Sequence, residues 1–434
     1  MMNHTLKPAL LIGCLLLLSM TGVAQTNRWN GIGPEGGAVG ALVQHPLQGN
    51  ILYATLQGKP APLFRSTDGG LRWTKCREFE AAVACLKTNP HKPNMLYVVT
   101  GSAQFGVIGG ETPEPGRLYE SGDRGKTWSS KPLPPIYAFT RIEFDAKAPG
   151  TIHALAHVPM TQGVVYLKST DDGSTWMTTE VLSDRGWATN LTLDKSNPDM
   201  IYVGAYPMMM TNDSKFLYRS TNGGKTFSPV TLKTNYISPV NDVVLDPRNP
   251  GRIFFLNYGG VYRSTDGGAT WEKNKGTVSA PQRLWIDPVN SGHVIVLAGR
   301  GVAESNDGGV TFKEAAGKLP GSVVSSVVVA PGAKTAIFVS NTAGIFRTTD
   351  LGNSWLPSHK GILGTQITSL RLSASSPGTL LAGVMTNAVY KTSAAGAPAV
   401  AWDQLPVFYT CTSIGDIQVM PKKPYKVLAI EGGG

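Results

Sequence analysis

The sequence predicts an all-β protein, a single β-propeller built from four-stranded blades. Three observations predict this fold: a Ser-x-Asp-x-Gly-x-x-aromatic phrase recurs along the chain, a pair of short alternating strands precedes each copy, and turn-forming residues are abundant. Gly occurs 50 times and Pro 30 times in 434 residues, whereas only 16% of the residues are charged. Gly and Pro separate many short strands, and 41% hydrophobic residues provide the material for a core.

The recurring phrase has the form of a tight hairpin turn followed by an aromatic residue, as in Ser264-Thr-Asp-Gly-Gly-Ala-Thr-Trp271. The Ser and Asp side chains offer acceptors to the N–H groups of the turn, and the glycine allows a positive φ. We therefore interpret the acidic or amide position as structural in all seven copies. These positions are Asp68, Asp123, Asp171, Asn222, Asp266, Asp307 and Asp350. An eroded eighth copy runs from Thr392 to Trp402.

The copies recur roughly every 40 to 55 residues, the length of one four-stranded blade. Counting the strand pairs as well as the phrases predicts about eight to nine blades, or ten if the C-terminus is incomplete. Arg28-Trp29-Asn30 resembles the outermost strand of a blade. We therefore expect an N-terminal strand to complete the last blade and close the ring, which would leave no exposed sheet edge.

Residues 1–24 predict a signal peptide, with Lys7 before a short apolar run and cleavage after Ala24. A lipoprotein signal ending at Cys14 is the alternative. The apolar run is too short for a membrane span, and no later stretch is longer. We expect residues 25–434 to form the propeller as a secreted or periplasmic monomer.

The charge pattern and the His and Cys spacing argue against two classes of ligand. The net charge is +10, but the basic residues are scattered, so nucleic acid is not an expected partner. No His or Cys spacing suits a metal, and neither a metal nor a cofactor is expected. Cleavage of the signal would leave Cys76, Cys85 and Cys411, an odd number with at least one free thiol.

The first strand of each repeat alternates between apolar and polar residues before its turn. Because the innermost strands of a propeller surround the axis, we expect the polar positions to border a central channel. These positions include Arg141, Glu143, Asn190, Thr192, Asp242, Arg283, Trp285, Arg371, Asp416 and Gln418. One interpretation is a water-filled channel whose walls are polar without any further function.

The other interpretation is a binding or catalytic mouth. In it the three arginines, with Trp285, bind an anionic ligand, and Glu143, Asp242 and Asp416 are candidate catalytic acids or bases. Trp187 and Tyr206 lie next to long connections and are predicted to form a platform for a glycan or a peptide.

The two phrases together resemble the Asp-box, or bacterial neuraminidase repeat, superfamily, especially its sortilin-type and xyloglucanase-type branches. Asp246-Pro-Arg-Asn-Pro250 followed by Val261-Tyr-Arg-Ser-Thr-Asp-Gly-Gly268 shows the alternation. The resemblance implies the fold, but this superfamily mixes hydrolases, receptors and assembly factors. In sialidases an arginine phrase precedes the first box, whereas here Phe64-Arg65 runs directly into Ser66. The catalytic Asp-Ile-Gly-Gly phrase of xyloglucanases corresponds to Thr55-Leu-Gln-Gly58, without an acid.

These observations lead to two functional hypotheses of different class. The first is an exported, non-catalytic propeller that binds a protein or polysaccharide through the mouth of its channel. The alternative is a glycoside hydrolase, xyloglucanase-like or sialidase-like, acting on an extracellular glycan. A hydrolase requires two carboxyl groups roughly 5–10 Å apart.

Overall fold

A computed structural model describes residues 35–101, 116–135, 138–158, 163–183, 186–207, 215–232, 238–276, 278–299, 301–320, 324–330, 336–364, 367–372, 379–384, 388–393, 402–405, 414–419 and 427–431. The residues in these ranges form strands and turns, and none of them forms a helix that could cross a membrane. The predicted signal peptide and Arg28-Trp29-Asn30 lie outside the described residues.

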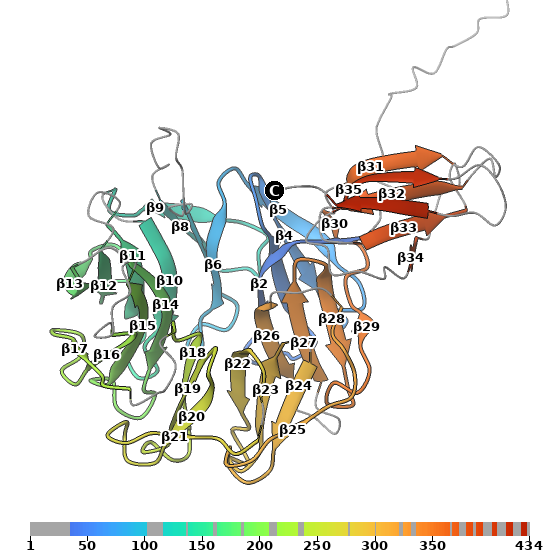
Figure 1. Ribbon diagram of the computed structural model, residues 1–434. Coiled ribbons are helices and arrows are strands. Elements are labelled where there is room, and N and C mark those ends of the chain that lie inside the picture. Colours follow the sequence, from blue (N-terminus) through green and yellow to red (C-terminus); the bar gives the residue numbers. More distant parts are fainter. Residues whose placement is uncertain are drawn as a thin grey trace, which may run out of the picture. The chain divides into compact units, whose positions relative to one another are not determined.

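Seven antiparallel sheets of four consecutive strands follow one another along the chain (Figure 1). We number them blade 1 to blade 7. Their first strands are β2 (Val39–Gln44), β6 (Val83–Thr88), β10 (Ala138–Phe144), β14 (Gly186–Leu193), β18 (Asp242–Leu245), β22 (Pro281–Ile286) and β26 (Val324–Ala330). The second strands are β3 (Leu52–Leu56), β7 (Leu96–Thr100), β11 (Ile152–His157), β15 (Ile201–Pro207), β19 (Ile253–Asn257), β23 (Val294–Ala298) and β27 (Ala336–Asn341).

The two outer strands of each blade are joined by the Asp-box turn. The third strands are β4 (Ala61–Ser66), β8 (Arg117–Ser121), β12 (Val164–Ser169), β16 (Leu217–Ser220), β20 (Gly260–Ser264), β24 (Gly301–Ser305) and β28 (Gly344–Thr348). The outermost strands are β5 (Thr74–Phe79), β9 (Ser129–Pro132), β13 (Met177–Leu182), β17 (Ser228–Pro229), β21 (Glu272–Lys273), β25 (Lys313–Glu314) and β29 (Leu356–Pro357).

The seven blades form a closed ring, because the first strand of each blade neighbours the first strand of the next and β26 in turn neighbours β2. The core confirms this closure. It consists of seven hydrophobic clusters, and each cluster lies in the seam between two successive blades. In the closing seam, Val39 and Leu52 of blade 1 pack with Phe338 and Ile345 of blade 7.

The expectation of eight to nine blades in one ring was therefore wrong. The eighth repeat forms a separate sheet of β31 (Ile367–Leu372), β32 (Leu380–Val384), β33 (Ala388–Thr392) and β34 (Asp403–Leu405), and the ninth strand pair is β35 (Ile414–Val419) with β36 (Val427–Glu431). The β35 strand neighbours β31 and β32. The later repeats are left out of the ring because the apolar faces of blade 7 and blade 1 already cover each other.

Closure by an N-terminal outer strand is not confirmed either. Each of the seven blades supplies its own fourth strand, including β29 in blade 7. Instead, β1 (Gly36–Gly37) pairs in parallel with β30 (Leu363–Gly364), just after blade 7. The seam is also bridged by the Trp73 indole, whose Nε1–H donates to the Ser358 carbonyl oxygen at 2.7 Å.

The Asp-box turns lie on the same face of the ring as the turns between first and second strands. In blade 5 the Gly267 N–H donates to the Gly251 oxygen at 2.9 Å, and the equivalent bond recurs at Gly308 in blade 6. Arginines also join neighbouring blades on this face, as where Arg219 Nη1 donates to the Gly267 oxygen at 3.2 Å. The opposite face, carrying the other connections, we call the mouth face.

Candidate functional site

The Asp boxes use their polar atoms within their own turns. Ser264 Oγ donates to Asp266 Oδ1 at 2.7 Å and accepts the Gly268 N–H at 2.8 Å. Asp266 also accepts the N–H and the hydroxyl of Thr270, and that hydroxyl is the main reason why the pKa of Asp266 is lowered. Gly268 has a φ of 88°, which a side chain would disfavour. These bonds agree with the structural role that the sequence predicts for the acidic position of the box.

Asn222 shows that the box does not need a carboxylate. Its Oδ1 accepts the Ser220 hydroxyl and the Thr226 N–H, and its Nδ2 donates to the Thr226 hydroxyl at 2.8 Å. The amide therefore reproduces the bonds made by the acid elsewhere. An amide is a poor substitute for a catalytic acid or base, so this copy argues against chemistry at the boxes.

A β-bulge in the first strand precedes the predicted channel positions. Six of the seven ring strands shift register there, for example between Phe139 and Arg141 in β10. The register then aligns two layers of residues from blade to blade. The mouth layer, farther from the turn, contains Ala41, Cys85, Arg141, Asn190, Asp242, Arg283 and Ser326. The turn layer contains Val43, Lys87, Glu143, Thr192, Val244, Trp285 and Val328.

Asp242 joins three blades at the mouth layer. Its Oδ1 accepts the Asn190 side-chain amide of blade 4 at 2.8 Å, and its Oδ2 accepts the Leu284 N–H of blade 6 at 3.1 Å. Burial raises the pKa of Asp242, and the nearby Arg283 guanidinium offsets only part of that effect. Arg283 in turn donates to the Asn241 oxygen at 3.2 Å, back toward blade 5. These bonds lock the first strands of blades 4, 5 and 6 together.

Lys87 and Glu143 form an ion pair between blades 2 and 3, and 30% of each side chain is exposed. Burial by itself lowers the pKa of Lys87, but the Glu143 carboxylate reverses the effect and the net pKa is raised. Burial raises the pKa of the Cys85 thiol, which keeps it protonated at neutral pH. Both Cys85 and Cys76 are free thiols.

Arg141 lies on β10, the first strand of blade 3. It interacts electrostatically with Cys85 and Lys87 of blade 2 and with Asp242 and Arg283 of blades 5 and 6. Only a charge near the centre of the ring is within reach of residues on both sides. The structure therefore brings Arg141, Glu143, Asp242 and Arg283 to one channel.

Arg371 and Asp416 do not join this set. Arg371 lies on β31 and Asp416 on β35, both outside the ring of seven first strands. They were expected in the channel because all repeats were placed in one ring. Trp285 lies in the turn layer, half-buried, with its ring 6.0 Å from His293 in an edge-on contact.

Trp187 and Tyr206 come together near the mouth face. Their rings stack with centroids 5.3 Å apart and an interplanar angle of 26°, and both side chains are half-buried. They pair directly across β14 and β15, beside the connections that enter and leave these strands. The stacked pair provides an aromatic surface with a fixed orientation.

Sequence reasoning missed Lys87 and Cys85. Both lie in the channel register, but their strand ends in Asn89-Pro90 rather than in Asp-Pro, so an alignment on the Asp-Pro turn passes over it. Aligning on the proline alone finds them.

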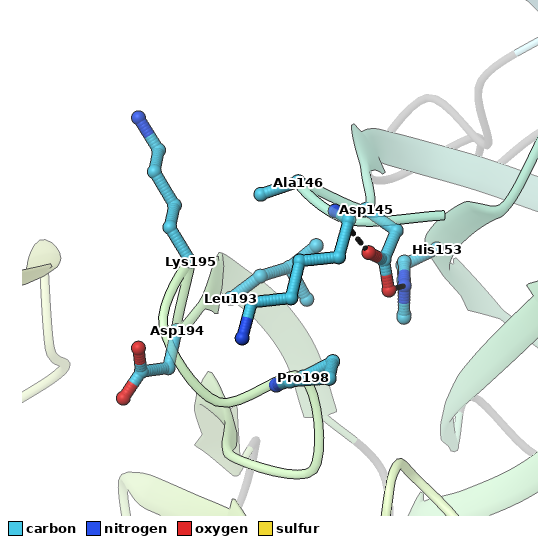
Figure 2. A pocket seen from close by; sticks show the side chains of 8 residues that line it. Asp145, Ala146, His153, Leu193, Asp194, Lys195 and Pro198 are labelled. Atoms are coloured by element: carbon cyan, nitrogen blue, oxygen red, sulfur yellow. Dashed lines mark hydrogen bonds and ion pairs between the residues drawn. The ribbon is translucent and has the colours of Figure 1, made fainter. Parts of the chain in front are cut away.

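A second missed group is a buried polar chain in blade 3. His153 Nδ1 lies 2.6 Å from the Tyr166 hydroxyl, and its Nε2 lies 3.4 Å from Asp145 Oδ2. Burial lowers the pKa of His153 to about 4, so the ring is neutral at physiological pH. Figure 2 shows His153 and Asp145 at the wall of a small pocket between the turns of blades 3 and 4. This pocket lies on the Asp-box face, away from the mouth.

Comparisons with known proteins agree with the repeat and the fold. The model of the BNR/Asp-box repeat family matches residues 262–273, the box of blade 5. The chain therefore carries a BNR/Asp-box repeat. The Asp-box propeller resembles the crystal structure of an ancestral GH74 enzyme with a TM-score of 0.65 and 15% identity, over 94% of this chain and 60% of that one. YCF48 from Cyanidioschyzon merolae matches with a TM-score of 0.54 and 14% identity, over 73% of this chain and 97% of that one.

Two curated relatives of the Asp-box propeller are xyloglucanases. A probable oligoxyloglucan-reducing end-specific xyloglucanase of Neosartorya fischeri is 27% identical over 226 residues, 48% of this chain and 26% of the relative. Xyloglucanase Xgh74A of Acetivibrio thermocellus is 24% identical over 298 residues, 57% of this chain and 32% of the relative. The Asp-box propeller thus matches a quarter to a third of the length of these relatives.

Proposed function

We propose that the Asp-box propeller acts outside the cell on a glycan, as a glycoside hydrolase of the xyloglucanase type. The observation that carries the proposal is the stacked Trp187–Tyr206 pair near the mouth face. Sugar rings present apolar C–H faces that pack against aromatic rings, and ligands enter propellers at the mouth of the channel. The xyloglucanase relatives support a glycan as the ligand.

Two carboxyl groups in the channel are the candidates for the chemistry. Asp242, whose pKa is raised by burial, is suited to hold a proton and act as the general acid. Glu143, paired with Lys87, is the candidate base or nucleophile. Asp416 is the third candidate from the sequence and would have to act from β35.

Glycan binding without cleavage is the second candidate function. It is favoured by the bonds of Asp242 to Asn190 and to the Leu284 N–H, which occupy both carboxylate oxygens in holding blades together. It is also favoured by Thr55-Leu-Gln-Gly58, which lacks the acid of the xyloglucanase phrase. Here the aromatic pair and the channel arginines bind the ligand and no bond is cleaved.

The test is a panel of polysaccharides that includes xyloglucan, scored for reducing-end release and for retardation in affinity gels. A hydrolase releases reducing ends, and Glu143→Gln and Asp242→Asn each lower the rate by roughly 10²-fold or more. Asp123→Asn, on the Asp-box face, is the matched control and keeps the wild-type rate. Retardation that Trp187→Ala abolishes, without release, supports the binding function. Neither release nor retardation on any glycan contradicts both.

A further inference from the structure

Among the described residues of the channel the charges do not cancel, and Arg141 carries the excess charge. Three cationic side chains, Lys87, Arg141 and Arg283, face two carboxyl groups, Glu143 and Asp242. Lys87 is held by Glu143, and Arg283 lies beside Asp242 and donates to backbone oxygens. Arg141 forms no ion pair with any of the described residues, although Asp242 is close enough to interact with it.

The hydrogen-bond donors of Arg141 are also unused. No acceptor contacts its guanidinium within the described ranges, although the side chain is only half-exposed. Asp242 cannot turn toward it, since its two oxygens are engaged with blades 4 and 6. A guanidinium is a rigid fork of five donors that matches a carboxylate, and the nitrogens of Arg141 are not buried, so they are open to an incoming anion.

We infer that Arg141 binds the carboxylate of an acidic sugar, so that the glycan recognised at the mouth contains a uronic acid. This inference rests on the proposed function in that a glycan binds at the mouth, but it replaces the neutral xyloglucan of the relatives with an acidic glycan. The uncompensated guanidinium attracts an anion, and Arg283 and Lys87 add to the positive potential around it.

Trp187 of the aromatic pair lies on the same strand as Asn190, a mouth-layer residue of the blade next to Arg141. Trp187 precedes Asn190 by three residues on β14, and Asn190 belongs to the same layer as Arg141. Three residues of strand correspond to roughly 10 Å. A chain stacked on Trp187 and Tyr206 can therefore place an acidic group in the channel mouth.

The experiment compares two acidic oligosaccharides with their own methyl esters, which differ only in charge. Trigalacturonate and a glucuronic-acid-containing oligosaccharide are titrated against the wild type, Arg141→Gln and Arg141→Lys by calorimetry. We expect the wild type to bind at least one acid about tenfold or more tightly than its ester, because a charge-assisted bidentate pair is lost in the ester. Arg141→Gln removes the difference, and Arg141→Lys restores part of it.

The control is Arg72→Gln, which removes one positive charge from the exposed Asp-box face and leaves the preference intact. An unchanged urea midpoint in Arg141→Gln shows that the channel still folds. The inference is wrong if neither acid binds better than its ester, or if Arg141→Gln keeps the preference. Either result leaves the proposed function standing when neutral glycans still bind or are cleaved, so the two failures are distinguishable.

Discussion

His153 is a titratable side chain at a position where neighbouring blades carry aromatic rings. The register aligns it with Tyr202 in blade 4 and Phe254 in blade 5. It is 1% exposed, and its partners are the Tyr166 hydroxyl and the Asp145 carboxylate. Because the ring is neutral, Nε2–H can donate to Asp145 while Nδ1 accepts from Tyr166. The imidazole thus satisfies two polar groups inside a seam.

This burial predicts that the protein loses stability in mild acid. The pKa of His153 is about 4 when folded and about 6.5 when unfolded, so between these values the unfolded state binds more protons. Stability is therefore complete above pH 6.5 and falls as the pH drops toward 4, by about 1–3 kcal/mol for this group. His157, whose pKa burial also lowers to about 4, acts in the same direction.

Urea unfolding at pH values from 4.5 to 7 checks this prediction with two variants. His153→Phe removes one of the three histidines whose pKa is lowered by burial, the others being His157 and His359, and should reduce the slope of unfolding free energy against pH by roughly a third. Tyr166→Phe keeps the imidazole but removes the hydroxyl that contacts it. This variant should be less stable at every pH, and the slope of its unfolding free energy against pH should equal that of the wild type. Equal slopes in His153→Phe and the wild type would show that another group carries the acid sensitivity.

For single residues, the sequence predicted the strand face on which a side chain lies better than it predicted the hydrogen-bond partner of that side chain. Because side chains of a strand alternate, the pattern placed Asp242, Arg283 and Arg141 on one face of their strands, and the structure brings them to one channel. It did not predict that Asp242 would accept the Leu284 N–H, or that Arg141 would have no acceptor in the part of the chain that the structure describes. Such bonds cross a seam, so they depend on how two blades pack and not on either strand alone.

The Asp box is the element that the sequence described most completely. Its hydroxyl, acceptor and positive-φ glycine were expected from local turn chemistry, and the bonds of Ser264, Asp266 and Gly268 follow that expectation. Local motifs are readable because all partners lie within a few residues. The β-bulges before the mouth layer were not expected, since a bulge adds one residue to one strand without changing its composition.

The presence of a hydroxyl at the first position of the box should therefore matter more to stability than whether that residue is Ser or Thr. Ser264 is 2% exposed and its Oγ serves both Asp266 and the Gly268 N–H. We expect Ser264→Ala to lower the free energy of unfolding by about 1–3 kcal/mol, because a buried N–H loses its acceptor. Ser264→Thr is the control, since Thr348 makes the same bonds in blade 7. Urea denaturation of the two variants tests this prediction. Equal losses of unfolding free energy would mean that packing, and not the hydroxyl, determines the stability of the box.

At the scale of the whole molecule, the number of blades was the feature that repeat counting could not provide. The eighth repeat and the ninth strand pair keep the blade pattern, yet they lie outside the ring. Closure is decided by whether the apolar face of one blade covers that of another. Blade 7 meets blade 1 through Phe338, Ile345, Val39 and Leu52, and no short phrase in the sequence records that contact.

The closing seam differs from the other seams in its polar bonds. Trp73 Nε1–H donates to the Ser358 oxygen, and the Ser358 hydroxyl donates to the Gly70 oxygen at 2.7 Å. Gly361, with a φ of 92°, approaches the Trp73 carbonyl so closely that a Cβ would clash with it. The segment after blade 7 is thus fastened over the Asp box of blade 1, where it holds the two ends of the ring.

The tryptophans of two boxes provide a matched test of this fastening. Trp73→Phe removes the indole bond across the seam, whereas Trp271→Phe removes an indole N–H that has no acceptor within the described residues. Both variants lose the same volume, but Trp73 is 4% exposed and Trp271 is only half-buried, so the excess cost of Trp73→Phe, about 1–2 kcal/mol in urea unfolding, is an upper bound for the bond at the seam. Trp73→Phe should also speed proteolytic cleavage near residues 356–364. If Trp271→Phe costs as much and exposes the same segment, the closing seam is held by its apolar cluster alone.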